Sequence, residues 1–354
     1  MSRSAGDCPE FALLLRCCQW NFAERPDERP ELSGTLDWPH FVELARFHRV
    51  QGLAWNALAQ GPAPPDAAEA LSAEARSIAA TNLASARECS ELVRAFARAD
   101  IPLLFLKGLT VAALAYRSPM LKMGWDIDVL VAKCDLIEAA AILAERAYRR
   151  TIPSPATNLA NWHSSHKESV WARPKEHLYV ELHTRLADND RLIPTIGVES
   201  PRRDVGVLPG VSLPTLGPDE LFAYLCVHGA SSLWFRLKWI TDLAALLHKQ
   251  TLDIEHLYRR SQELGAGRSA GQALLLADAL YGSLADAPHL RDELARDPFN
   301  RWLAKSARKQ LAASVEPTSR LLGTTRIHLT QFGLLPGLRF KLSELLRQTR
   351  VALP

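Results

Sequence analysis

The chain has 354 residues, of which 47% are hydrophobic and 23% are charged, and its formal net charge at pH 7 is +3. This composition is ordinary for a globular protein with a sizeable core, and the length allows two or three domains. The small net charge excludes an acidic disordered tail and a nucleic-acid footprint spread over the whole surface, but it leaves a local basic surface open.

The cysteines and the N-terminus bear on the compartment. Six cysteines are scattered along the chain without a CxxC pair, so the sequence indicates neither a zinc site nor a disulfide framework. The stretch MSRSAGDCPEF lacks the apolar core of a signal peptide, and no apolar run approaches the ~20 residues that cross a bilayer. We therefore expect a cytoplasmic protein without membrane association.

The hydrophobic patterns divide the chain into three regions. Residues 1–99 show apolar residues at helical spacing, and residues 66–99 contain neither Gly nor Pro, which predicts one long helix. Residues 100–215 alternate short apolar runs with helical patterns, and residues 216–354 return to helices. The predicted fold class is α+β, with a small mixed β-sheet core flanked by N-terminal and C-terminal helical regions.

The central region begins with a regular order of elements. The predicted elements are strands over 101–106, 126–132 and 177–186, and helices over 109–118 and 135–148. Asp135 is expected at the N-cap of the second helix. The stretch between that helix and the third strand contains Pro153 and Pro155 and is expected to be rich in loops.

Two aspartates lie one residue apart in the stretch DIDVLV. Because side chains alternate along a strand, Ile127, Val129 and Val131 share one face. Asp126 and Asp128 share the opposite face, where two neighbouring carboxylates repel unless a cation neutralises them. Mg²⁺ prefers oxygen ligands from carboxylates and phosphates, so the pair predicts half of a metal site that also holds a polyphosphate.

The third strand, HLYVELH, offers a further carboxylate. Its apolar residues face one way, and Glu181 and His183 face the other. If the strand lies beside DIDVLV, Glu181 joins Asp126 and Asp128. Three carboxylates on adjacent strands suit two metal ions about 3.5–4 Å apart, as in phosphoryl transfer. His183 contacts a donor or acceptor, or else it packs in the core, and the sequence leaves both open.

A candidate phosphate cradle precedes the aspartates in the stretch LLFLKGLTVAAL. Gly108 removes a Cβ where the backbone approaches a ligand, and the first turn of the following helix offers free N–H groups to an anion. Lys107 adds a positive charge, and Thr110 adds a hydroxyl donor.

This order resembles the DNA polymerase β-like nucleotidyltransferase superfamily, in which a strand, a Gly-containing turn, an Asp-x-Asp strand and a third carboxylate follow one another. More closely, the chain resembles an uncharacterised bacterial nucleotidyltransferase family over about residues 40–250. The motifs that carry the resemblance are LKGLTVAALAYRSPML, DIDVLV, VELH and HGASSLWFRLKWITDLAALL. Two departures concern Lys122, where many members have Arg, and Glu181, where Asp is common. Lys supplies a point charge but no bidentate fork.

The resemblance implies a function and a set of roles. Asp126, Asp128 and Glu181 would bind two Mg²⁺ ions, and Glu181 would help to activate the acceptor hydroxyl. An NTP, with ATP the expected donor, would be bound by Lys107, Gly108, Thr110, Lys122 and His183. The residues of the C-terminal motif, with Trp234 and Trp239, either wall the base or acceptor pocket or pack. The expected reaction transfers NMP to a hydroxyl of a small molecule or peptide and releases pyrophosphate.

Two alternatives remain open at this stage. One is a nucleotidyltransferase that modifies tRNA or protein, for which a basic stripe beside the site would speak, although the near-neutral charge does not favour nucleic acid. The other is a non-catalytic nucleotide-binding scaffold. His163 and His166 have HxxH spacing but no acidic partner at metalloprotease spacing, so we expect a loop or strand role for them rather than a metal site.

Overall fold

The computed structural model describes residues 8–23, 30, 35–61, 63–116, 118–249, 253–319 and 322–352. Residues 1–7, in the predicted N-terminal region, and Arg117, in the helix predicted after Gly108, lie outside the described residues.

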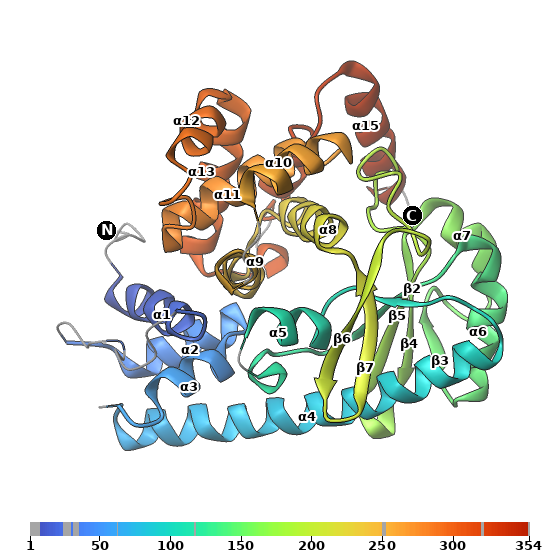
Figure 1. The fold of residues 1–354 in the computed structure, drawn as a ribbon, viewed down its shortest axis with the longest axis horizontal. Coiled ribbons are helices and arrows are strands. Elements are labelled where there is room, and N and C mark those ends of the chain that lie inside the picture. The colour runs from blue at the N-terminus through green and yellow to red at the C-terminus, as the bar shows by residue number, and fades with distance from the viewer. Residues whose placement is uncertain are drawn as a thin grey trace.

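A mixed five-stranded sheet lies to one side of the molecule, at the lower right in Figure 1. Its strands are β1 (Leu104–Phe105), β2 (Ile127–Leu130), β3 (Arg149–Ile152), β4 (Glu168–Arg173) and β5 (Leu178–His183). The spatial order is β1-β2-β5-β4-β3, in which β2 and β5 are parallel and the other pairs are antiparallel. The predicted α+β class with a small mixed sheet is confirmed.

A separate antiparallel hairpin extends the β structure beside the short edge strand β1. It consists of β6 (Arg202–Leu208) and β7 (Val211–Leu216). The Thr215 hydroxyl donates to the Phe105 carbonyl oxygen at 2.6 Å, which ties β7 to β1. The hairpin therefore covers backbone that the edge of the sheet would otherwise leave unpaired.

Fifteen α-helices surround the sheet within the described part of the chain. The N-terminal helices are α1 (Pro9–Trp20), α2 (Trp38–His48), α3 (Gln51–Leu58) and α4 (Pro65–Arg98), and those between the strands are α5 (Leu109–Ala115), α6 (Leu136–Glu145) and α7 (Leu159–Ser165). The C-terminal helices are α8 (Pro218–Ser231), α9 (Leu237–Lys249), α10 (Ile254–Glu263), α11 (Gly267–Tyr281), α12 (Pro288–Arg296), α13 (Pro298–Ala313), α14 (Thr325–Gln331) and α15 (Leu338–Ala352).

Helix α4 is one uninterrupted helix of 34 residues, as the sequence predicts. In Figure 1 it runs along the lower edge of the molecule, from below α1–α3 to below the sheet. Its first half, with Leu71, belongs to one hydrophobic cluster, and its second half, with Leu92, belongs to another. The helix therefore joins the two cores.

The two hydrophobic clusters do not follow the order of the chain. One contains residues of the N-terminal helices and of the C-terminal helices, such as Leu14 of α1 and Ile240 of α9. The other lies between the sheet, α4 and α6 and includes Val129 and Leu143. The two helical regions thus pack together on one side of the sheet, and the boundaries after residues 99 and 215 stay a prediction.

The central region contains more strands than the sequence predicts. The stretch with Pro153 and Pro155, expected to be rich in loops, contains β3, α7 and β4, and residues 202–216 form the hairpin. These strands mix polar and apolar residues, so hydrophobic periodicity does not reveal them. Asp135 does stand at the N-cap of α6, but its side chain makes no capping bond because a 3₁₀ turn enters the helix.

None of the described helices combines the length and the apolarity that crossing a bilayer requires.

Candidate functional site

The pairing of β2 with β5 brings the predicted carboxylates together. Asp128 lies directly opposite Glu181 in the parallel register, and Asp126 comes one residue before β2. Ile127 and Val129 belong to the cluster between the sheet and α4, on the opposite face. The alternation along β2 therefore separates core residues from charged ones.

Two cationic side chains hold Asp128, which is buried. Lys107 Nζ lies 2.8 Å from Asp128 Oδ1, and His183 Nε2 lies 3.2 Å from the same oxygen. Burial alone would raise the pKa of Asp128, but the attraction to Lys107 and the hydrogen bond with His183 hold the pKa well below its usual value. Asp128 is therefore ionised at neutral pH.

His183 lies among three carboxylates. Besides its contact with Asp128, its Nε2 lies 3.6 Å from Glu181 Oε2, and its Nδ1 lies 3.3 Å from Glu168 Oε2. Burial would lower the pKa of His183, but the bonds with Asp128 and Glu181 raise it to about 9. The imidazolium is almost fully enclosed, so it acts on the site by orienting these carboxylates.

The pKa of Glu181 is shifted in the opposite direction to that of Asp128. Burial raises the pKa of Glu181 to about 7, the bond with His183 acts against this, and the negative charge of Asp128 adds to it. The two facing carboxylates thus differ: one is firmly ionised, and the other carries a proton part of the time near neutral pH.

The Lys107–Gly108 turn connects β1 to α5 beside these carboxylates. Gly108 has φ 66° and ψ −120°, which a residue with a Cβ rarely adopts. Thr110 is placed differently from the expectation for a phosphate ligand. Its side chain is buried, and its hydroxyl donates to the Lys107 carbonyl oxygen at 3.2 Å, within the turn itself.

The carboxylates and Lys107 open onto a cavity of about 230 Å³. Its walls contain five cationic and five acidic side chains together with apolar and aromatic ones. The lining residues are Arg49, Lys107, Gly108, Lys122, Met123, Gly124, Asp126, Asp128, Lys167, Glu168, Glu181, Leu225, His228, Lys238, Trp239 and Asp242. Both signs of charge therefore face the same space, as a site for an anionic ligand with cations requires.

Lys122 lines this cavity and belongs to a buried network of polar contacts. Its ammonium lies 3.0 Å from Asp242 Oδ2, and the Tyr116 hydroxyl donates to Asp242 Oδ1 at 2.8 Å. Asn82 of α4 donates its side-chain N–H to the Lys122 carbonyl oxygen at 2.7 Å. One residue of the C-terminal motif thus has a physical role, because Asp242 of α9 fixes Lys122.

The two tryptophans of the C-terminal motif have separate places. Trp234 is fully buried against Gly229, where a Cβ would lie 2.4 Å from its ring. Trp239 lines the cavity and packs edge-on against His228, with ring centroids 5.4 Å apart. Trp234 is therefore a core residue, and Trp239 offers an aromatic surface to the cavity.

Sequence reasoning missed four charged residues of the cavity: Arg49, Lys167, Glu168 and Lys238. Glu168 of β4 pairs in register with His183, so recognising β4 in the stretch KESVWAR would have placed it. Burial, together with the repulsion from Lys122, lowers the pKa of Lys238 to about 7. Arg49 ends α2 in the left-handed region, a tertiary placement that no local pattern indicates.

His163 lies on helix α7 rather than on the expected loop or strand, and His166 follows the end of that helix, in extended backbone. His163 in α7 hydrogen-bonds to Thr184 and Ser169 through its two ring nitrogens, and His166 stacks on Trp162. Neither belongs to a group of potential metal ligands among the described residues.

The donor atoms fit a divalent cation. Asp128 and Glu181 each present a ligand oxygen, and these atoms lie within 4.8 Å of one another and of a ring nitrogen of His183. The protonated His183 has no free lone pair, so it orients the carboxylates and does not bind the ion. Asp126 adds a third carboxylate at the cavity wall. Carboxylate oxygens are the ligands of Mg²⁺, and a bound cation would offset both the burial and the repulsion by Asp128 that raise the pKa of Glu181.

One protein family matches the chain. The family described as "Uncharacterised nucleotidyltransferase" matches residues 34–282, which span the N-terminal helices from α2, the whole sheet, the cavity and α8–α11. No curated protein matches the chain significantly.

Proposed function

The chain belongs to this uncharacterised nucleotidyltransferase family, and we propose that it transfers a nucleoside monophosphate from an NTP to a hydroxyl acceptor and releases pyrophosphate. The observation that carries the proposal is the opposition of Asp128 and Glu181 on parallel strands, beside Lys107 and at the wall of a cavity. Nucleotidyl transfer requires such a combination of metal-binding carboxylates and phosphate-binding cations.

Asp126, Asp128 and Glu181 would hold the metal ions, for which Mg²⁺ is the expected species. When bound, Mg²⁺ would offset the charge of the triphosphate and of the pyrophosphate that leaves. His183, charged and enclosed, keeps Asp128 and Glu181 in place as ligands. In metal sites, such outer contacts orient the side chains that bind the ion.

The cations of the cavity would bind the triphosphate. Lys107 sits at the Gly108 turn, and Lys122 and Lys238 extend the positive wall toward α9. Burial of these ammonium groups strengthens their attraction to phosphate oxygens, because the surroundings screen charge less than water does. ATP is the expected donor, with Trp239 as an aromatic surface for its base.

In the transfer step, the acceptor oxygen forms a bond to the α-phosphorus while the bond between the α-phosphorus and the bridging oxygen breaks. The proton of the hydroxyl passes to a base, and pyrophosphate takes the electron pair of the broken bond. Glu181 would ligate the ion that activates the acceptor hydroxyl, or accept its proton. Positioning and charge neutralisation would supply most of the rate.

The test uses the full chain with Mg²⁺ and ATP radiolabelled either at the α-phosphate or at the γ-phosphate. With hydroxyl-bearing small molecules and peptides as acceptors, we expect the α-label in the product and the γ-label in pyrophosphate. Transfer of the γ-label to the acceptor would contradict the proposal, since it marks a kinase. ATP binding without turnover on any acceptor would favour the nucleotide-binding scaffold.

A specific observation favours a second candidate, an RNA acceptor. A larger cavity of about 540 Å³ is lined by residues from the end of α7, the loop after β5 and α15. It is lined by five arginines and two aspartates, namely Arg185, Arg191, Arg339, Arg347, Arg350, Asp188 and Asp190. Arg185 follows His183 by two residues, so this basic surface adjoins the site and could bind phosphates.

The second candidate is tested with a single-stranded RNA oligonucleotide. Binding should weaken steeply between about 50 and 200 mM salt and weaken further in Arg339→Ser, whereas Arg308→Ser on the exposed side of α13 serves as the matched control. Equal binding by both variants and the unmodified protein would remove RNA from consideration and leave small molecules and peptides.

A further inference from the structure

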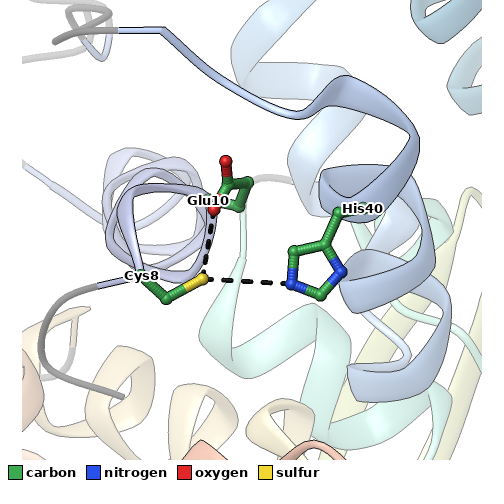
Figure 2. Close-up of side chains that lie close together, drawn as sticks. All are labelled: Cys8, Glu10 and His40. Carbon is green, nitrogen blue, oxygen red and sulfur yellow. Dashed lines mark hydrogen bonds between the residues drawn. The ribbon is translucent and has the colours of Figure 1, made fainter. Parts of the chain in front are cut away.

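A second group of potential metal ligands lies outside the cavity, between α1 and α2. Cys8 and Glu10 stand at the start of α1, and His40 stands in the first turn of α2 (Figure 2). Figure 2 shows the three side chains converging from the two helices, with the thiol between the carboxylate and the imidazole. The sequence alone gave no indication of this group, because 32 residues separate Cys8 from His40.

The distances suit a tetrahedral ion. Cys8 Sγ lies 3.2 Å from Glu10 Oε2 and 4.0 Å from His40 Nε2, and all three ligand atoms lie within 4.8 Å of one another. Zn²⁺ with Zn–S near 2.3 Å and Zn–N or Zn–O near 2.1 Å separates sulfur from the other ligands by about 3.5 Å at tetrahedral angles. The observed separations bracket this value, so small side-chain rotations close the site.

Asp37 orients the Glu10 carboxylate and fixes the backbone that carries His40. The Asp37 backbone N–H donates to Glu10 Oε1 at 2.8 Å, which leaves Oε2 directed to the thiol. The Asp37 side chain accepts from the His40 backbone N–H at 3.0 Å and caps α2. Such outer contacts fix the direction of ligands in metal sites. A hydrogen bond between Cys8 and Glu10 does not account for the His40 imidazole, which also lies beside the thiol.

We propose that Cys8, Glu10 and His40 form a Zn²⁺ site that ties α1 to α2, separate from the carboxylates of the cavity. A thiolate and an imidazole select Zn²⁺ over Mg²⁺, whereas the cavity offers mostly carboxylate oxygens. The described residues supply three ligands, so a water molecule or an exogenous ligand takes the fourth position.

Binding is a proton exchange at the thiol. The Cys8 S–H bond breaks, the sulfur lone pair binds Zn²⁺, and the proton passes to solvent or buffer. No oxidant or reductant takes part. The affinity for Zn²⁺ should therefore rise with pH until protons no longer compete with the ion for Cys8 and His40.

The test uses the metal-free full chain and Co²⁺ as a spectroscopic substitute for Zn²⁺. We expect one Co²⁺ to bind at Cys8 and to give a near-ultraviolet sulfur-to-cobalt charge-transfer band, which Zn²⁺ abolishes by displacement, whereas Co²⁺ at the carboxylates of the cavity gives no such band. Cys8→Ser should lose the band and weaken Zn²⁺ binding more than about 100-fold, beyond the usual effect of an outer contact. His40→Ala should weaken it as well, and it decides the matter if Cys8→Ser does not fold.

Two controls separate this site from the rest of the protein. Cys134→Ser removes an exposed cysteine elsewhere and should keep the band. Asp128→Asn alters the cavity, which has no sulfur ligand, and should keep the band even if nucleotidyl transfer is lost. Absence of the band in the unmodified protein, its survival in Cys8→Ser, or its loss in Cys134→Ser would overturn the proposal.

Discussion

Asp128 and Glu181 face each other across neighbouring parallel strands, and Lys107 binds the first of them at 2.8 Å. This relationship places two carboxylates on one side of the sheet while Val129 and Val180 remain in the core. The charge is balanced within the protein by Lys107 and His183, yet Glu181 retains a raised pKa. The site is therefore organised before any ligand binds and still favours additional positive charge.

Lys107→Met should reduce nucleotidyl transfer by about 100-fold or more, because it removes the cation that binds Asp128 and that would bind the triphosphate. The measurement is the steady-state rate of pyrophosphate release. The buried Asp128 also loses its partner, so we expect a lower melting temperature. Lys107→Arg should retain only part of the rate, because a guanidinium does not replace an ammonium at such a site.

The matched control for Lys107→Met is Lys175→Met, at an exposed position after β4. It should leave both the rate and the melting temperature unchanged. Equal losses in the two variants would show that the effect of Lys107 is not specific to the site.

Gly108→Ala should destabilise the protein by about 1–3 kcal/mol, since its φ of 66° with ψ −120° strains a residue that has a Cβ. The nearest atom to a Cβ there, the Asp126 carbonyl oxygen, lies 3.8 Å away, so the cost comes from the backbone and not from a clash. Urea unfolding measures the free energy. Gly206→Ala, in open space on β6, is the control, and an equal cost in both would refute the conformational argument.

Binding of ATP should be accompanied by proton uptake at Lys238. Its pKa is lowered to about 7 by burial and by Lys122, so part of the population is neutral at neutral pH. A bound triphosphate favours the ammonium, and the affinity should therefore rise as the pH falls through 7. Calorimetry in buffers of different ionisation enthalpy measures the uptake. In Lys238→Arg, which stays charged, the uptake should decrease, and an unchanged uptake would contradict the assignment.

Much of the site follows from the sequence. The period-two alternation in DIDVLV and HLYVELH separates the core face from the carboxylates, and the structure places Asp128 opposite Glu181 as that alternation requires. Lys107 and Gly108 follow from their position between a strand and a helix. What local patterns cannot supply is the pairing of distant segments. Glu168 enters through β4, a strand of mixed polarity between β5 and β3, and Arg49 enters through the end of a helix in another region.

Two further features depend on the packing of helices. The N-terminal and C-terminal helices share one core, as Leu14 and Ile240 illustrate, although more than 200 residues separate them. Cys8 and His40 meet only because α1 packs on α2. Spacing rules for metal sites apply within one element or one turn, and they do not detect ligands from two packed helices.

Acid should destabilise the protein through His48. The Leu237 backbone N–H donates to His48 Nδ1 at 3.2 Å, so this nitrogen carries no proton in the fold. Burial, with the nearby charge of Arg236, lowers the pKa of His48 to about 3. Between pH 3 and the usual value of 6.5, the unfolded chain binds more protons. The free energy of unfolding therefore rises with pH across this window, and this stabilisation is lost as the pH falls.

His48→Asn keeps an acceptor for Leu237 but cannot titrate, so the pH dependence of the free energy of unfolding should become shallower. His289→Asn, at an exposed position, should keep the dependence of the unmodified protein. Urea unfolding at a series of pH values compares them, and the same slope in all three proteins would exclude His48 as the source.

The most direct test of the account is the rate of pyrophosphate release by Asp128→Asn, with ATP, Mg²⁺ and an acceptor identified by label transfer. Asn keeps the size of the side chain but removes the charge that faces Lys107 and Glu181, and Asp204→Asn on the exposed face of β6 is the matched control. We predict a loss of at least about 100-fold for Asp128→Asn and an unchanged rate for the control. Full activity of a folded Asp128→Asn protein would contradict the assignment of this site.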